Sequence, residues 1–185
     1  MGAAGEPVVF IGFGSQVTEP DLWKTLLRGA LQMGSRVILG PGSSNSGAIP
    51  SDEQVHVVEY VPYRWLFPRV AVVAHHCGAG TAGEALRAGA RSVLVPFTGE
   101  QRFWAARLFD AGVAPPPLNP RTLTADQFAH ALRSVLQSQV WASRSTAVRR
   151  RIAAEDGVGT AVRLIERYAI RREVDGGRGQ APPGE

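Results

Sequence analysis

The feature that most constrains the fold of this chain is the alternation of short apolar runs with helical segments. The runs are rich in β-branched residues, which is typical of strands buried on both faces. Strands are predicted at Val8–Phe13, Arg36–Leu39, Val55–Val58, Val70–Ala74 and Ser92–Val95. Strands that alternate with helices imply βαβ crossovers and a parallel sheet. The sequence therefore predicts an α/β fold with a doubly wound, Rossmann-like parallel sheet.

Helices are expected between and after these strands. Thr18 is predicted to cap the first helix, with Pro20 in its first turn. The predicted helices are Thr18–Met33, Thr81–Ala88, Gln101–Ala111, Ala125–Gln137, Ser138–Ala154 and Val158–Ile170. Pro41–Ser51 is expected to be an exposed loop, and Ala114–Pro120 is too rich in proline for a helix. We expect a flexible tail at residues 1–6, one domain at 7–170 and a disordered tail at 171–185.

The amino-acid composition indicates the class of protein and its cellular compartment. Its 185 residues are 44% hydrophobic and 19% charged, which suits one soluble domain. A single cysteine, Cys77, excludes a disulfide framework and favours a reducing compartment. The sequence has no secretory signal and no apolar stretch of about 20 residues. We therefore expect a cytoplasmic location.

The net charge of +4 is concentrated in arginines near the end of the chain. They are Arg144, Arg149, Arg150, Arg151, Arg163, Arg167, Arg171 and Arg172. A solvated helix surface explains them, and peripheral contact with anionic lipids is the alternative. Nucleic acid is not an expected partner, because no recognised motif accompanies the charge. The histidines lack metal-ligand spacing, so no metal is expected; His56 and His130 are interpreted as structural.

Ligands of a parallel sheet bind beyond the carboxyl ends of its strands. The loop His75–Thr81 joins a strand to a helix there. Gly78 and Gly80 let the backbone approach a ligand, and the helix N-terminus offers N–H groups to a phosphate. Thr81 can add a hydroxyl and His76 a ring N–H. Alternatively, Thr81 and Glu84 form a capping box and the glycines permit packing.

Two further loops end at the same predicted edge. Gly12–Ser15 follows the first strand, and Ser15 could reach the same phosphates; the alternative is an ordinary turn serine. Pro96–Gln101 follows the fifth strand and carries Glu100 and Gln101, which suit the hydroxyls of a sugar. Its alternative is capping of the next helix by Glu100.

The combined motifs resemble the GT-B glycosyltransferases of family 1, and specifically the C-terminal domain of the sterol 3-β-glucosyltransferase type and its bacterial relatives. The resemblance covers most of Val8–Tyr168. It is carried by GFGS at Gly12–Ser15, VPYRWLFPRVAVVAHHCGAGT at Val61–Thr81, PFTGEQRFWAARLFDAGVAPPPL at Pro96–Leu118 and AAEDGVGTAVRLIERY at Ala153–Tyr168.

The resemblance implies that the chain binds a UDP-sugar, usually UDP-glucose, as a co-substrate and needs no cofactor. Ser15, His76, Gly78, Ala79, Gly80 and Thr81 would hold the diphosphate. The segment Tyr60–Val61–Pro62 would meet the uracil, and Glu100 with Gln101 the glucose hydroxyls. In plant relatives a glutamate at the spacing of Glu84 binds the ribose.

Three residues depart from the sterol type. Cys77 replaces a glycine, Glu84 replaces a small residue, and Glu100 replaces an aspartate that is one methylene shorter. Cys77 is interpreted as a small buried filler and not as a nucleophile, because no base–nucleophile arrangement is evident. The longer Glu100 side chain is expected to shift or weaken sugar preference.

In this family the acceptor-binding domain comes first and supplies the general base, a histidine assisted by an aspartate. No catalytic residue can be assigned within this chain. We therefore expect a fragment, an excised domain, or the donor-binding subunit that pairs with an acceptor-binding domain or subunit, acting on a sterol or other lipophilic hydroxyl. A non-catalytic nucleotide-sugar-binding or regulatory module is the alternative. A dinucleotide-binding module is disfavoured, because GFGSQV lacks the third glycine of G-x-G-x-x-G.

Overall fold

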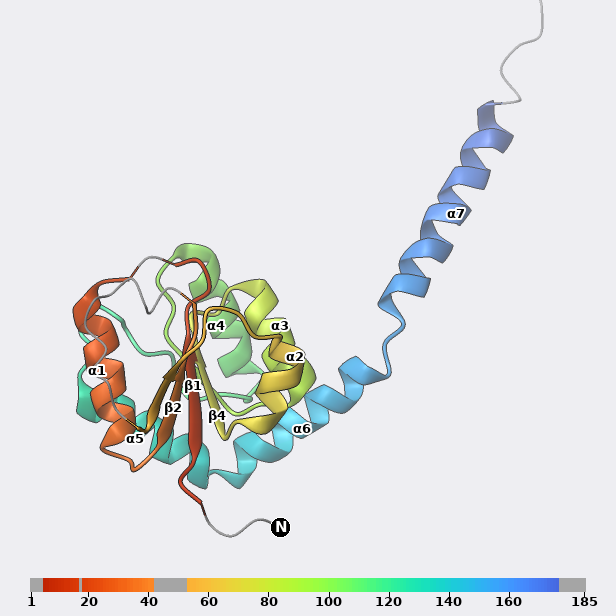
Figure 1. Cartoon of the computed structure of the whole chain (residues 1–185). Helices are drawn as coiled ribbons and strands as arrows, with labels where there is room; N and C mark the ends of the chain where they lie inside the picture. Colours follow the sequence, from red (N-terminus) through yellow and green to blue (C-terminus); the bar gives the residue numbers. More distant parts are fainter. Residues whose placement is uncertain (1–4, 17, 42–52, 177–185) are drawn as a thin grey trace, which may run out of the picture. The chain divides into compact units, whose positions relative to one another are not determined.

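The computed structural model describes residues 5–16, 18–41 and 53–176. A five-stranded sheet runs through them in the order β3-β2-β1-β4-β5 (Figure 1). The strands are β1 (Val8–Gly12), β2 (Arg36–Leu39), β3 (Val55–Val57), β4 (Val72–His75) and β5 (Ser92–Leu94). All four neighbouring pairs are parallel, so the predicted parallel α/β sheet is confirmed.

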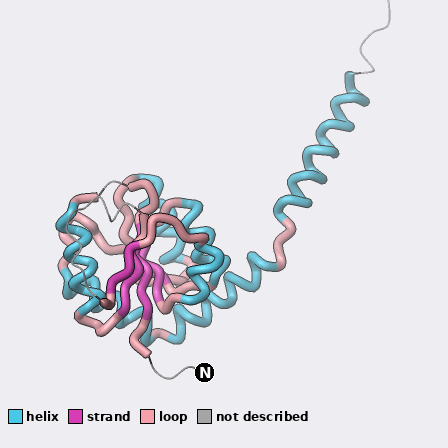
Figure 2. The backbone as a smooth tube through the Cα atoms, viewed as in Figure 1, coloured by secondary structure: helices cyan, strands magenta, loops and turns pink. Residues whose placement is uncertain are grey.

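Helices cover both faces of the sheet, with the strands between them (Figure 2). On one face lie α1 (Pro20–Leu31) and α5 (Ala125–Gln137). The other face carries α2 (Tyr63–Leu66), the 3₁₀ turn η2 (Phe67–Arg69), α3 (Ala79–Ala88) and α4 (Gly99–Asp110). The chain continues into α6 (Gln139–Ala153) and α7 (Gly157–Gly176). This is the doubly wound arrangement expected from alternating strands and helices.

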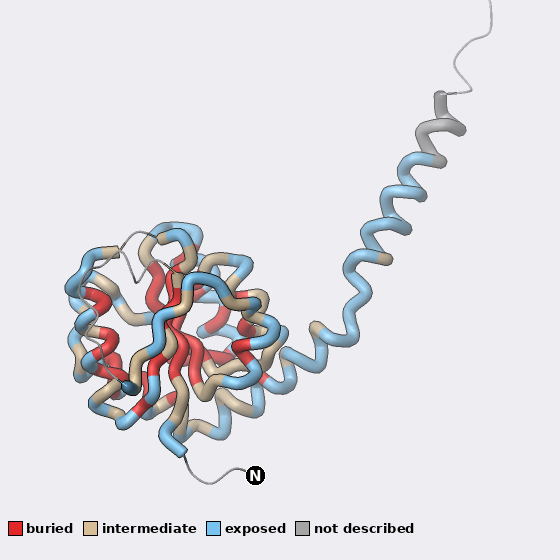
Figure 3. Tube along the Cα trace, in the orientation of Figure 1, coloured by how far each residue is buried: buried red, intermediate tan, exposed pale blue. Residues whose placement is uncertain are grey.

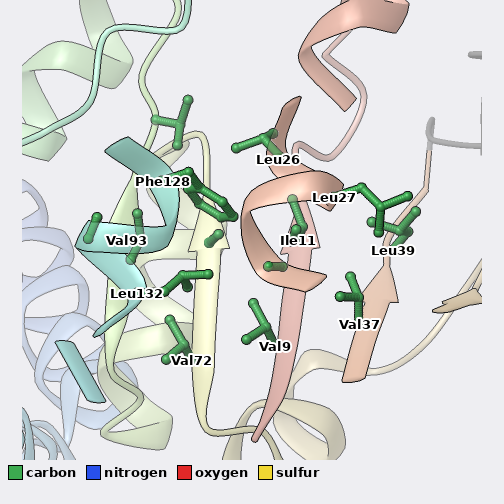
Figure 4. Close-up of a cluster of buried hydrophobic side chains, with 14 of the residues drawn as sticks. Val9, Ile11, Leu26, Leu27, Val37, Leu39, Val72, Val93, Phe128 and Leu132 are labelled. Atoms are coloured by element: carbon green, nitrogen blue, oxygen red, sulfur yellow. The ribbon is translucent and has the colours of Figure 1, made fainter. Parts of the chain in front are cut away.

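Alternate residues of each strand enter opposite halves of the core. Val9 and Ile11 pack under α1 and α5, where Leu26 and Phe128 meet them (Figure 4). Phe10, between them in sequence, packs on the other face. All five side chains are fully buried, and burial is concentrated along the strands and the inner helix faces (Figure 3). The near-continuous apolar strands follow from this two-sided burial.

Several helix ends differ from the predictions. Thr18 does not cap α1: Glu19 holds the N-cap position and Pro20 begins the helix, because the proline ring presets the helical φ. The short α2 and η2 were not predicted, since a helix of four residues carries no periodic signal. Helix α7 continues past the predicted end at Ile170 to Gly176. The predicted loop Pro41–Ser51 lies almost wholly, and the predicted tails partly, outside the described residues.

A second unit of the chain begins at Ala154 and holds α7. Asp156 stabilises the start of this helix, because its carboxylate accepts hydrogen bonds from Gly159 N–H at 2.9 Å and from Arg163 at 3.3 Å. Val158, Ile165 and Tyr168 are each more than two-thirds exposed. Within the ranges that the structure describes, no helix combines the length and hydropathy that a bilayer crossing requires.

Gly29 permits the close packing of α1 on α5. A Cβ at Gly29 would lie 2.6 Å from the carbonyl oxygen of Ala125. We expect Gly29→Ala to lower the free energy of unfolding by about 1–3 kcal/mol, measured by urea denaturation. Gly83→Ala in α3 is the matched control, because the added Cβ meets only the flexible end of Arg87. The control should be neutral or stabilising by about 1 kcal/mol; equal destabilisation of both would contradict the packing argument.

Candidate functional site

The candidate site lies where β1 and β4 end side by side. Gly12 is paired with His75, the last residues of the two strands. From β1 the chain first builds outward to β2 and β3, and then returns to build β4 and β5 on the other side (Figure 1). Such a reversal of strand order opens a crevice at the carboxyl ends of the two central strands. The predicted loops Gly12–Ser15 and His75–Thr81 therefore start side by side at the carboxyl ends of these strands.

The N-terminus of α3 faces this edge with unpaired backbone donors. Gly78 is the N-cap residue and makes no side-chain cap, and the first helical hydrogen bond runs from Ala82 N–H to Gly78 O at 2.9 Å. Ala79 and Gly80 are exposed, and open space surrounds the position that a Cβ on Gly80 would take. These amides, with the positive end of the helix dipole, suit an anionic oxygen.

The capping box between Thr81 and Glu84 is not formed. Helix α3 begins at Ala79, so Thr81 lies inside its first turn and cannot be its N-cap. The Glu84 side chain instead pairs with Arg64 and Arg87. The interpretation of this segment as structural capping is therefore wrong, and the Thr81 hydroxyl stands half-buried beside the exposed amides.

His76 is held between two glycines. A Cβ on Gly78 would lie 2.5 Å from His76 Nε2, and one on Gly14 would lie 3.3 Å from His76 Cε1. Gly14 also has a φ of 60°, which favours glycine in the turn that carries the exposed Ser15. Burial lowers the pKa of His76, and the backbone of Gly12 and the carboxylate of Glu100 act in the opposite direction. The ring thus lies between the two loops, and its burial favours the neutral form.

His75 and Cys77 are the buried residues of the loop His75–Thr81. His75 is fully buried, its Nδ1 accepts the N–H of Cys77 at 3.2 Å, and burial lowers its pKa to about 3. Cys77 is also fully buried, and burial raises the pKa of its thiol to about 12. A thiol that keeps its proton is no nucleophile, which agrees with the interpretation of Cys77 as a filler.

The third loop joins the first through a pair of glutamines. Gln101 Nε2 donates to Gln16 Oε1 at 3.3 Å, and Gln101 Oε1 accepts from the N–H groups of Phe97 and Thr98. Gln101 therefore caps α4 and is only 6% exposed. Capping by Glu100, the alternative drawn from the sequence, is wrong because Gln101 fills that role.

Glu100 is exposed at the start of α4 and accepts the indole N–H of Trp104 at 3.1 Å. The hydrogen bond orients the carboxylate within one helical turn. The Glu100 carboxylate acts to raise the pKa of His76, against the effect of burial. A carboxylate, an imidazole and a helix N-terminus thus share one edge of the sheet.

A cleft of about 460 Å³ adjoins this edge on the α3 side of the sheet. Tyr60, Val61 and Glu84, for which the resemblance implies contact with the nucleoside, line this cleft. Arg64 Nε and Arg87 Nη1 lie 3.4 and 3.0 Å from the Glu84 carboxylate, whose side chain is 22% exposed. The two guanidinium groups fix a carboxylate at the wall of the cleft.

Three contributors to the site were not found from the sequence: Gln16, Arg64 and Trp104. Trp104 had a detectable signal, since an indole four residues after Glu100 lies on the same helix face. The others depend on contacts between segments distant in sequence. Among the residues described, no three side chains of His, Cys, Asp or Glu gather closely enough to hold a metal ion.

Residues 24–165 match the family described as the C-terminal domain of erythromycin biosynthesis protein CIII-like proteins. A sterol 3-β-glucosyltransferase of Aspergillus fumigatus is 35% identical over 173 residues, or 88% of this chain and 12% of the relative. The Arabidopsis thaliana sterol 3-β-glucosyltransferase UGT80B1 is 36% identical over 169 residues, or 89% of this chain and 27% of the relative. The chain thus spans about an eighth to a quarter of these relatives.

Among solved structures, the glycosyltransferase of kitacinnamycin superposes with a TM-score of 0.79 at 24% identity. The match covers 90% of this chain and 44% of that chain. At this identity the likeness concerns the fold, which agrees with the parallel sheet and its two helical layers.

Because His75 is buried, we expect the free energy of unfolding to decrease in acid. Its pKa is about 3 in the folded chain and about 6.5 when unfolded, so below about pH 6.5 the unfolded state binds a proton that the folded state excludes. This contribution to the free energy of unfolding is therefore fully present above about pH 6.5 and is lost as the pH decreases. We expect this residue to contribute a loss of about 2 kcal/mol between about pH 7 and about pH 5.

Urea denaturation of the wild type and of His75→Asn at both pH values isolates this contribution, because asparagine does not titrate. The loss common to both proteins belongs to the other ionisable groups. An equal loss in the two proteins would show that His75 titrates normally.

Proposed function

The chain belongs to the EryCIII-like C-terminal domains of GT-B glycosyltransferases, and from this premise we propose that it binds a UDP-sugar, with UDP-glucose as the donor. The proposal places the diphosphate between the loops that follow β1 and β4. The observation that carries it is the convergence of exposed α3 amides, Thr81 and His76 at the strand-order reversal, beside Ser15.

The diphosphate would lie against the N-terminus of α3. Ala79, Gly80 and Thr81 would donate backbone N–H groups, and the hydroxyls of Thr81 and Ser15 would add donors. A neutral His76 would donate from Nε2, the ring nitrogen next to Gly78 and Gly14. Because such donors are fixed before the ligand arrives, they stabilise the charge that develops on a departing diphosphate.

The sugar would lie toward α4. Glu100 would accept hydrogen bonds from the sugar hydroxyls, held by the Trp104 indole. Gln101 has fewer hydrogen-bonding groups free for the sugar than the resemblance implies, because its side-chain carbonyl oxygen already accepts hydrogen bonds from two backbone N–H groups. It would act through the remaining hydrogen of its amide nitrogen, the other being donated to Gln16.

The nucleoside would occupy the 460 Å³ cleft. The uracil would stack against Tyr60, which is 85% exposed, and would bond the main chain at Val61. Glu84, held between Arg64 and Arg87, would accept hydrogen bonds from the ribose hydroxyls. A fixed carboxylate favours a ligand with a 2′-hydroxyl over one without it, because the deoxy ligand leaves the carboxylate unpaired.

In the whole enzyme this domain would hold the donor while a partner domain or subunit binds the acceptor, a sterol or other lipophilic alcohol, and removes its proton. The acceptor oxygen would then attack the anomeric carbon, and the diphosphate would leave with inversion. A dinucleotide-binding function is disfavoured by the structure as well, because α1 begins only at Pro20, well after the glycine turn. A glycine-rich dinucleotide site needs that helix to open directly at the turn.

Calorimetric titration tests the donor site. We expect the chain to bind UDP and UDP-glucose, to ignore NADH, and to transfer little sugar by itself. His76→Ala should weaken UDP binding about tenfold or more, because a hydrogen bond to a charged ligand is lost. His130→Ala, which removes an exposed histidine from α5, is the control and should bind as the wild type does. Failure of the wild type to bind UDP at millimolar concentration would refute the proposal.

The ribose contact makes a separate prediction. The wild type should bind UDP more tightly than dUDP by about tenfold, and Glu84→Ala should reduce this preference to about twofold or less. Asp110→Ala is the control: it removes an exposed carboxylate from the C-terminal end of α4, and this variant should keep the preference for UDP over dUDP. Retention of the full preference in Glu84→Ala would show that this residue does not contact the ribose.

A further inference from the structure

Cys77 has an unusual backbone conformation for its residue type. Its φ of 67° lies in the left-handed region, and within the described ranges it is the one residue other than glycine with a positive φ. A side chain in this region crowds the backbone, so the conformation persists only where the surroundings enforce it. The turn occurs directly between His76 and Gly78, at the centre of the candidate diphosphate site.

His75 supplies the contact that enforces this turn. Its Nδ1 accepts the Cys77 N–H at 3.2 Å, and the Cys77 thiol lies 3.7 Å from the His75 carbonyl oxygen. The backbone of His75 is fixed by pairing with Gly12 on β1 and Leu94 on β5. A fully buried ring on a strand-paired backbone therefore accepts the N–H of a strained residue two positions along the chain.

Packing alone does not explain an imidazole at position 75. The side chain is fully buried, and its Nε2 has no hydrogen-bond partner among the described residues. A buried polar atom without a partner costs free energy that leucine would avoid. The Nδ1 bond to Cys77 is the interaction that an apolar residue could not supply.

We propose that His75 is a positioning residue of the diphosphate site: its neutral ring accepts the Cys77 N–H, holds the left-handed turn, and so sets the places of His76 and of the α3 amides. The ligand part of this inference rests on the proposed function. His75 itself is buried and touches no ligand. Its effect on binding passes through the backbone of Cys77.

The arrangement makes glycine at position 77 a direct test, because glycine adopts this φ without strain. UDP affinity is measured for the wild type, His75→Leu, Cys77→Gly and the double variant. We expect His75→Leu to weaken UDP binding about tenfold when Cys77 is present and about threefold or less in the Cys77→Gly background. His75→Asn keeps an acceptor near the Nδ1 position and should bind within about threefold of the wild type.

Equal weakening by His75→Leu in the two backgrounds would overturn the proposal, as would a His75→Asn variant as weak as His75→Leu. If the wild type does not bind UDP, the proposed function fails, but the same cycle in thermal unfolding still tests the turn. His75→Leu should then lower the melting temperature more in the wild-type background than in the Cys77→Gly background. An equal decrease in melting temperature in the two backgrounds would refute the proposed role of His75 in holding the turn.

Nitrogen-15 NMR of the wild-type imidazoles needs no variant. We expect His75 to be neutral, with its proton on Nε2 and a bare Nδ1. A proton on Nδ1 would exclude the hydrogen bond from Cys77 and refute the proposal even if His75→Leu fails to fold.

Discussion

The pairing of β1 with β4 is the interaction on which the rest of the site depends. Gly12 and His75 are paired in adjacent parallel strands, so the two loops that follow them start from one edge. The α3 N-terminus reaches that edge because the connection from β3 to β4 returns the chain to the opposite side of β1, and α3 follows β4. Without this reversal, Ser15 and His76 would belong to separate surfaces.

The loops at this edge consist largely of glycine and other small residues, and contacts between the loops hold them together. His76 occupies the space that glycine leaves at positions 14 and 78. Gln16 and Gln101 connect the first loop to the third across 85 residues of sequence. Polar groups fixed by such contacts lose little further entropy when a ligand arrives, which favours binding of a charged diphosphate.

Charged side chains are arranged differently around the 460 Å³ cleft and on α6. At the cleft, Arg64 and Arg87 flank a single carboxylate, Glu84, so the pairing orients an acceptor. On α6, Arg150 and Arg151 are exposed, in keeping with a solvated helix surface. Peripheral contact with a membrane stays a prediction from the charge pattern.

The sequence by itself determined the fold class and the loops that meet at the carboxyl edge of the sheet, because strand and helix periodicity are local and the loops after parallel strands start from the same edge. The glycine loops and His76 could be located for the same reason. The tertiary structure decided which polar groups remain available: Gln101 caps a helix, Glu84 pairs with two arginines, and His75 supports the turn at Cys77. These roles depend on the burial and packing of segments distant in sequence, which no local pattern encodes.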